Sequence, residues 1–296
     1  MIAVSLLLAA VVELKLLLSL IALSLVLSSD IMNMTAERPL ILASFFCIFA
    51  FMLKQVSDKP TLNTILTPQL LDLYDVNDSI VVIIDVFRAT STMATALYNG
   101  ATKIIPVDSA ELCIEMGKQT GGITAGERDG KVIPGLSYGN SPSEYPRSFI
   151  ENKTLIITTT NGTKLLHMAL KQGAKEIITG SFPNLSAVVS FLKQQNAPVI
   201  LGCSGWKNRF NIEDTLFAGA IIEEVKDQFT IHCDSSFMAN QLYNQHKHNL
   251  SEYIKGLTHW HRLAQYGLEA DMQYCVSKDV APSLPIFKNG ALINGL

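Results

Sequence analysis

The sequence has few cysteines, and none are spaced for chemistry that needs several thiols together. The five cysteines are widely separated and include no C-x-x-C pair; they are Cys47, Cys113, Cys203, Cys233 and Cys275. Disulfide frameworks and structural zinc sites use closely and regularly spaced cysteines, so neither is indicated. Free thiols fit a reducing compartment, and the expected location is the cytoplasm.

The sequence also lacks a large excess of either charge. It has 23 Lys and Arg against 26 Asp and Glu, a net charge of -3. A nucleic-acid partner is therefore not expected, because binding to a phosphate backbone needs a basic surface. No G-x-x-x-x-G-K-[ST] loop for nucleoside triphosphates occurs, and Phe87 interrupts the D-x-D motif of an aspartyl-phosphate mechanism.

Long stretches with little charge occur in residues 1–55, an apolar N-terminal extension. The stretch 1–27 has Glu13 and Lys15 as its only charges, and the stretch 40–53 has none. A membrane-spanning helix needs about 20 apolar residues. The first stretch is long enough but charged, and the second is uncharged but short, so neither meets the requirement fully.

Two interpretations of this extension stay open, since no basic region or small-residue cleavage site indicates a secretory signal. It is either a membrane segment that contacts the bilayer through residues 1–53, or translated upstream sequence before a true start at Met52. In both cases residues 56–296 are expected to form the functional domain.

An internal repeat organises residues 80–204. Short apolar runs alternate with stretches of helical periodicity, and NGATKIIPV at 99–107 matches QGAKEIITG at 172–180, an offset of 73 residues. Alternating strands and helices predict right-handed βαβ units and a largely parallel sheet. Two copies predict an α/β fold of two similar intertwined halves, layered α/β/α. The simpler alternative is that any two βαβ units look alike at this level.

The pattern also predicts where the helices lie. The expected helices are 90–99, 109–118, 161–172, 184–195, 213–226, 235–247 and 259–275, and a last strand is expected near 284–288.

Four polar clusters follow apolar runs that read as buried strands. The first is DVFRATST at 85–92, the second is GERDGKVIPGLSYGNSP at 126–142, the third is TTTNGT at 158–163, and the fourth is CSGWKNRFNIED at 203–214. Open α/β sheets bind their ligands at the carboxyl ends of parallel strands. The four clusters therefore predict one shared site.

Together the clusters resemble the 2-phosphosulfolactate phosphatase family over residues 62–290. The resemblance rests on DxxRATS, GER followed by IPG and GNSP, TTTNGT, and CxGWKxR followed by ED. It implies a phosphoric monoester hydrolase that uses Mg²⁺ and acts on a small anionic phosphoester. The implied reaction is 2-phospho-3-sulfolactate and water to 3-sulfolactate and phosphate. The oligomeric state stays open, with a homo-oligomer as one alternative.

Phosphoester hydrolysis needs hard oxygen ligands for Mg²⁺ and an activated nucleophile. The expected metal ligands are Asp85, Glu127, Glu213 and Asp214, and the expected catalytic residues are Asp85, Glu127, Arg128 and Asp214. The helix dipole also stabilises acidic residues in the first turn of a helix, and this effect alone would explain Glu213 and Asp214.

The phosphoryl oxygens need cations and donors. The expected substrate-binding residues are Arg88, Thr90, Ser91, Asn140, Ser141, Asn161, Gly162, Thr163, Lys207 and Arg209. Helix capping and Asx turns explain several of these hydroxyl and amide groups without a ligand. Four downstream polar residues, His261, Arg262, Asp271 and Asp279, fall where the family also has polar positions.

Two rival functions stay open. Cys203 and Arg209 satisfy C-x5-R, the pattern of a metal-independent phosphatase with a thiolate nucleophile. The apolar N-terminus and the cations also suit a membrane-tethered protein that binds a small anion without turning it over.

Overall fold

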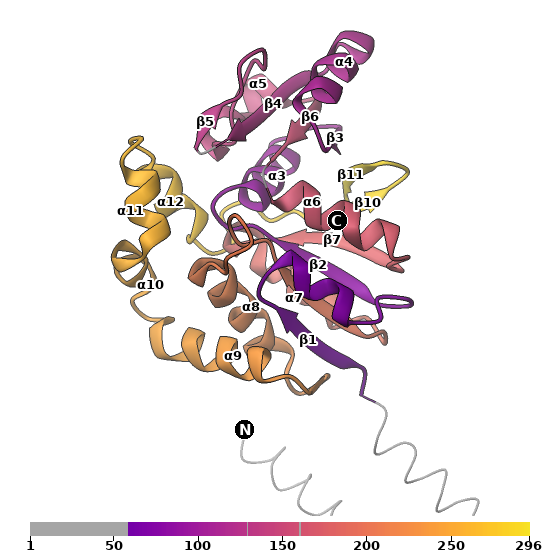
Figure 1. Cartoon of the computed structure of the whole chain (residues 1–296), viewed down its shortest axis with the longest axis vertical. Coiled ribbons are helices and arrows are strands. Elements are labelled where there is room, and N and C mark those ends of the chain that lie inside the picture. The colour runs from indigo at the N-terminus through magenta and orange to yellow at the C-terminus, as the bar shows by residue number, and fades with distance from the viewer. Residues whose placement is uncertain (1–58, 129, 160) are drawn as a thin grey trace, which may run out of the picture. The chain divides into compact units, whose positions relative to one another are not determined.

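The computed structural model describes residues 59–296 except 129 and 160. Figure 1 shows the helices and strands of this part of the chain with their labels. The interpretations of the N-terminal extension lie outside the described residues. In the part that the structure describes, no helix is long and apolar enough to cross a bilayer.

Eleven strands of the described chain form one mixed sheet. In spatial order they are β5 (Lys131–Val132), β4 (Ile123–Arg128), β6 (Thr154–Thr158), β3 (Lys103–Pro106), β11 (Ala291–Asn294), β10 (Pro285–Lys288), β7 (Glu176–Gly180), β2 (Ile80–Ile84), β8 (Val199–Cys203), β1 (Thr61–Ile65) and β9 (Thr230–Ile231). β2 and β8 are buried along their whole length, as expected for parallel strands covered on both faces.

The two halves exchange one strand each, and the exchanged strand lies in the middle of the other half. This arrangement confirms the predicted intertwined α/β fold. The first repeat supplies β2, β3 and β4, and the second supplies β6, β7 and β8. β2 lies between β7 and β8, whereas β6 lies between β3 and β4, and all four pairings are parallel. The β10–β11 hairpin joins the halves by pairing antiparallel to β7 and β3.

Helices cover both faces of the sheet. They are α3 (Ala89–Tyr98), α4 (Ala110–Thr120), α5 (Arg147–Ile150), α6 (Gly162–Lys171), α7 (Leu185–Leu192), α8 (Ile212–Val225), α9 (Asp234–His246), α10 (Leu250–Tyr253), α11 (Thr258–Ala264) and α12 (Glu269–Cys275). Four short 3-10 turns complete the described elements: η2 (Pro68–Leu73), η3 (Pro142–Glu144), η4 (Phe182–Asn184) and η5 (Ile254–Gly256).

Alternate residues of β2 enter two different hydrophobic cores. Val82 and Ile84 pack with residues of α7 and α8, whereas Val81 and Ile83 pack with residues of α3 and α6. Successive side chains of a strand point to opposite faces, so a strand with no polar position can serve two helical layers. This arrangement is the predicted α/β/α layering.

The predicted helices each begin within one residue of an observed helix, but several other features differ, and the short elements α5, α10, β5 and β9 were not predicted. The helix expected at 259–275 is two helices, separated where Gly267 adopts a φ of 72°. The strand β1 was not predicted. The last strand is a hairpin whose turn, Asn289 and Gly290, has positive φ at both residues, the usual signal for a tight β-turn.

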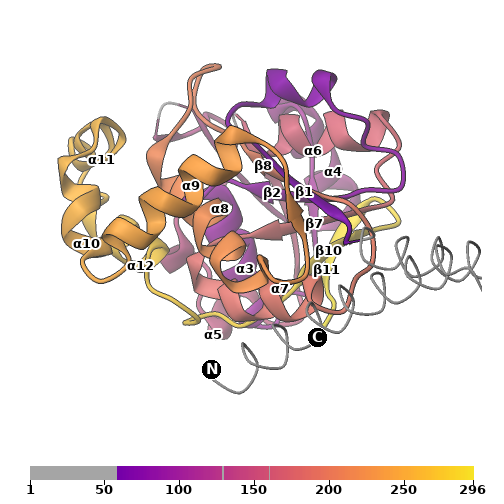
Figure 2. The same cartoon turned by 90° about the horizontal axis from the view of Figure 1, so that it is seen from below.

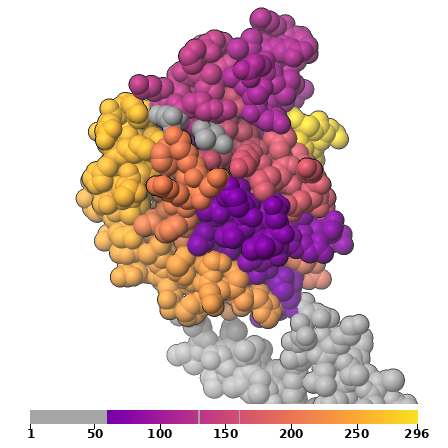
Figure 3. Space-filling view, viewed as in Figure 1, coloured from indigo at the N-terminus to yellow at the C-terminus, as the bar shows by residue number. Residues whose placement is uncertain are grey.

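The C-terminal helices α10, α11 and α12 stand beside the sheet at one edge of the molecule, and Figure 2 shows α9 lying along α8. Figure 3 shows the C-terminal helices meeting the lobe that contains β4 and β5 on the surface. Consistent with this, Lys131 of β5 lies 5.4 Å from the centre of the Tyr266 ring, in the segment between α11 and α12.

The packing of α8 on α9 depends on Gly219, where a Cβ atom would lie 2.0 Å from the backbone oxygen of Ala239. We expect Gly219→Ala to lower the free energy of unfolding by about 1–3 kcal/mol, because the two helices would have to separate. Urea denaturation would measure the loss. Gly256→Ala is the matched control, since a Cβ there meets no atom within 4 Å; equal stability of the two variants would contradict the prediction.

Candidate active site

One pocket collects residues from all four polar clusters. Its lining consists of Asp85, Phe87, Arg88, Glu127, Asn140, Asn161, Gly205, Trp206, His259, Arg262 and Leu263. The clusters supply the first eight of these residues, and α11 supplies the last three. The carboxyl ends of the strands thus meet at one place, as expected for an open α/β sheet.

The repeat explains why the clusters converge. The helices α3 and α6 begin at Ala89 and Gly162, which differ by the same 73 residues as the repeat. A Cβ on Gly162 would lie 3.3 Å from the Cβ of Ala89 and 3.1 Å from Oδ2 of Asp85. Equivalent helix N-termini therefore face each other beside Asp85, where their partial positive charges favour an anion.

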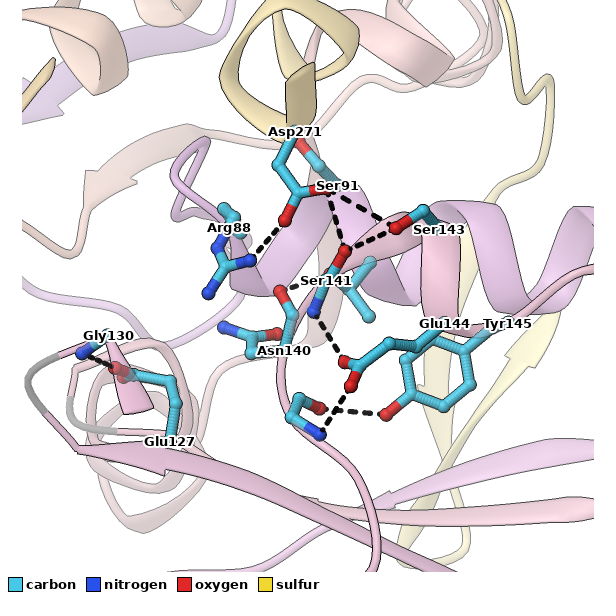
Figure 4. Close-up of polar contacts among 12 residues, drawn as sticks. Arg88, Ser91, Glu127, Gly130, Asn140, Ser141, Ser143, Glu144, Tyr145 and Asp271 are labelled. Carbon is cyan, nitrogen blue, oxygen red and sulfur yellow. Dashed lines mark hydrogen bonds and ion pairs between the residues drawn. The ribbon is translucent and has the colours of Figure 1, made fainter. Parts of the chain in front are cut away.

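Asp85 and Glu127 place two carboxylates on the pocket wall. Burial, together with the charge of Glu127, raises the pKa of Asp85 to about 7, against a smaller opposing effect of the Ala89 N–H. Glu127 accepts a hydrogen bond of 2.9 Å from the N–H of Gly130 (Figure 4). Near neutral pH Asp85 can therefore take up or release a proton at the pocket wall.

Arg88 is a buried cation whose partner lies behind it. Its side chain is 5% exposed and forms an ion pair with Asp271 of α12. Asp271 also accepts a hydrogen bond of 2.7 Å from the Ser141 hydroxyl, as Figure 4 shows. The acid fixes the guanidinium in place from outside the pocket, so the charge of Arg88 is directed to the pocket wall.

Asn140 lies between these groups, and its two oxygens differ in whether they have a hydrogen-bond partner. Its backbone oxygen accepts a hydrogen bond of 3.0 Å from the Thr92 hydroxyl. Its side-chain oxygen Oδ1 is buried and has no hydrogen-bond partner among the described residues. A buried amide oxygen is costly to leave unpaired, which marks it as a contact for a ligand.

Several predicted binding residues support the backbone and do not line the pocket. The hydroxyl of Thr90 bonds to the backbone of Asp85, that of Ser91 donates to Val86, and that of Thr163 donates to Thr159. Asn161 does line the pocket, and its amide donates a 2.9 Å bond to the oxygen of Gly205. Local hydrogen bonds to backbone oxygens therefore account for the three hydroxyls.

Three predicted cations lie outside the pocket lining. Arg128, Lys207 and Arg209 are exposed, and Arg128 donates to the backbone oxygen of Glu127. Adjacent residues of a strand point to opposite faces, so Glu127 and Arg128 of β4 cannot both face the pocket. Arg262 instead joins Arg88 at the pocket wall.

The four predicted metal ligands are not brought together as one site. Glu213 and Asp214 lie in the first turn of α8, fully buried and outside the pocket lining. Asp214 accepts hydrogen bonds from the N–H groups of Val86 and Gly205 at 2.8 and 3.0 Å. Among residues 59–296, with 129 and 160 left aside, no three His, Cys, Asp or Glu side chains form a metal-binding group.

Asp214 thus holds two loops of the site together from the inside. Burial raises the pKa of Asp214 well above its usual range, and the charges of Glu213 and Asp85 act in the same direction. The geometry gives this carboxylate a positioning role, because both of its oxygens are occupied by backbone donors.

The structure does not support the alternative with a thiolate nucleophile. Cys203 is fully buried at the end of β8 and does not line the pocket. Burial raises its pKa well above the usual range, and the charges of Asp214 and Glu213 act in the same direction. A reactive cysteine needs a lowered pKa and access to substrate, and Arg209 lies on the surface.

Sequence reasoning missed His259 altogether and assigned no role to Arg262 or Asp271. All three come from α11 and α12, whose approach to the pocket is a tertiary event. The spacing of His259 and Arg262 by three residues places them on one helix face, which was the available local signal.

A second pocket adjoins the first and shares Arg88, Glu127 and Asn140 with it. Its remaining lining residues are Gly130, Lys131, Val132, Gly139, Ser141, Glu144 and Leu268. The carboxylate of Glu144 accepts hydrogen bonds from the N–H groups of Gly139 and Ser141, both 3.1 Å long (Figure 4). The loop around Asn140 is therefore held rigidly between the two pockets.

Comparison with known proteins places this chain among phosphatases. The family model described as 2-phosphosulpholactate phosphatase matches residues 65–290. A Thermotoga maritima protein named probable 2-phosphosulfolactate phosphatase is 40% identical over 212 residues, covering 72% of this chain and 90% of the relative. Proteins of the same name from Caldanaerobacter subterraneus subsp. tengcongensis and Clostridium perfringens are 37% and 35% identical, covering 73% and 78% of this chain and 90% and 95% of the relatives. The chain therefore belongs to the 2-phosphosulpholactate phosphatase family of phosphoric monoester hydrolases.

Proposed function

We propose that the protein hydrolyses the phosphate ester of a small hydroxy acid that carries a second anionic group. The proposed reaction is 2-phospho-3-sulfolactate and water to 3-sulfolactate and phosphate, because the relatives are named probable 2-phosphosulfolactate phosphatase. The observation that carries it is one pocket whose wall contains the two carboxylates of Asp85 and Glu127 and the buried cation Arg88.

The residues of the pocket also suit the Mg²⁺ that we propose as cofactor. Mg²⁺ prefers hard oxygen ligands and often takes only one or two carboxylates, keeping water and substrate oxygens for the rest. Asp85 and Glu127 would hold it, and the unpaired Oδ1 of Asn140 is a third hard oxygen at the same wall. When bound, the ion would neutralise phosphoryl charge and make a coordinated water more acidic.

The chain itself contributes orientation and charge. Water must attack phosphorus while the ester P–O bond breaks, and negative charge grows on the departing oxygen. Arg88 offers a rigid fork for two phosphoryl oxygens, because Asp271 fixes its position from behind. Asp85 must be ionised either to hold a cation or to accept a proton, so activity should fall as the pH drops through about 7.

Phosphate release from 2-phospho-3-sulfolactate by the full chain tests the proposal. We expect EDTA to lower turnover at least about 100-fold, with recovery on adding Mg²⁺, because the ion would supply much of the charge stabilisation. Cys203→Ala should retain turnover within about 3-fold, since the thiol is outside the pocket.

Other outcomes favour the rivals. Turnover that resists EDTA and disappears with Cys203 would support the thiolate mechanism. Binding of the phosphoester without phosphate release, at any Mg²⁺ concentration, would support a small-anion binding protein.

A further inference from the structure

Arg262 reaches the pocket from α11 and rests on an aromatic side chain. Its guanidinium carbon lies 4.1 Å from the centre of the Trp206 ring. Trp206 is itself fixed, because its backbone exchanges hydrogen bonds of 2.8 and 2.9 Å with Arg209 in a tight loop. Stacking uses the face of a guanidinium and leaves its donors directed outward in the plane.

His259 contacts the guanidinium from one side and lines the pocket beside it. The Nη2 group of Arg262 lies against Nε2 of His259. Arginine can only donate, so Nε2 must accept, and the ring proton therefore resides on Nδ1. That Nδ1–H group donates to Oε1 of Glu213. The contacts thus require a neutral imidazole of one tautomer.

Glu213 ends this chain of contacts in the interior. Its side chain is 1% exposed, and its second oxygen has no hydrogen-bond partner among the described residues. A buried carboxylate of this kind stabilises the positive charge beyond the imidazole. The chain of contacts from Glu213 through His259 to Arg262 therefore runs from the core to the pocket wall.

Arg88 is held in a similar way, by Asp271 directly. Each arginine at the pocket has a buried acid behind it, and neither acid lines the pocket. The two anchors come from different elements, α12 for Arg88 and α8 for Arg262. Two cations fixed from behind are suited to a ligand with several negative oxygens.

We infer that Arg262 is a substrate-binding residue that contacts the phosphoryl oxygens, and that His259 and Glu213 are positioning residues for it. The inference rests on the proposed function for the identity of the ligand. Arg262, to which the sequence patterns assigned no role, thus takes the place of the three predicted cations Arg128, Lys207 and Arg209.

The test measures binding of inorganic phosphate to the full chain by calorimetry in the presence of Mg²⁺, together with kcat/KM on 2-phospho-3-sulfolactate. Arg262→Ala should weaken phosphate binding about 10- to 100-fold, the effect of one charge-assisted contact. Glu213→Gln should weaken it several-fold, because the amide keeps an acceptor for His259 but lacks the charge. Arg128→Ala and Arg209→Ala are matched controls and should stay within about 2-fold.

Chemical rescue separates a binding role from a structural one. Added guanidinium chloride at millimolar concentration should restore phosphate binding to Arg262→Ala and leave the controls unchanged. A folded Arg262→Ala protein that binds phosphate as tightly as wild type would overturn the inference, as would wild type that fails to bind phosphate at about 10 mM. If wild type binds phosphate through Arg262 yet hydrolyses no ester, the proposed function fails and the inference stands.

Discussion

Replacing Asp85 by asparagine should lower phosphate release about 1000-fold, the largest effect on activity that we expect from one substitution. The amide has nearly the same shape, but it carries no charge and cannot take up a proton. Asp85 lines the pocket and faces the start of both repeat helices, so each mechanism that the geometry allows uses its ionised form. Phosphate release at saturating Mg²⁺ would measure the effect.

Asp227→Asn provides the matched control, because Asp227 is an exposed carboxylate away from the pocket lining. Asp85→Asn activity above a tenth of wild type would exclude an essential role. In wild type the acid limb of the pH profile should follow the Asp85 pKa of about 7. In the variant that limb should disappear, since no proton is gained or lost at this position.

The same substitution should raise stability at alkaline pH. The folded state raises the pKa of Asp85 from 3.8 to about 7, so folding favours its protonated form. Stability is therefore lost as the pH rises between these values, and asparagine avoids that loss. With EDTA present, the free energy of unfolding at about pH 8 should rise by on the order of 2 kcal/mol, and the gain should vanish near pH 4.

Breaking the ion pair between Arg88 and Asp271 should cause the second large effect. Asp271→Ala is expected to lower the free energy of unfolding by about 3–5 kcal/mol, because the guanidinium would remain buried without its partner. The two side chains are 5% and 10% exposed, so water cannot replace the lost contact. Urea denaturation would measure stability, and phosphate release should fall as well.

A double replacement separates the two effects. Arg88→Met with Asp271→Leu removes both charges and should recover most of the lost stability, whereas phosphate release should stay near zero. Glu151→Ala is the control, since its pair with Arg147 is 49% and 56% exposed and should change stability by less than about 1 kcal/mol. Recovery of activity in the double variant would show that Arg88 is not a substrate-binding residue.

Local patterns were sufficient for the polar clusters but not for the direction of each side chain. Glu127 and Arg128 are neighbours with equally suitable chemistry, and only the first lines the pocket. The two-residue period of a strand excludes one of these two residues from the pocket, but it does not show which one. Likewise Glu213 and Asp214 both turn inward, because the orientation of α8 on the sheet brings them to His259 and to two backbone donors.

By itself the sequence determined the alternating strands and helices, the repeat with its offset of 73, the family, and the four loops that carry polar residues. These depend on periodicity and on short runs of residues, which are local properties. Only the tertiary structure decided that β2 and β6 change places, and that Arg88 and Arg262 are the cations at the pocket. It also decided which acids lie behind them. Such choices arise because residues distant in the chain, from β2 to α12, must satisfy one another's charge and hydrogen bonds once they are buried.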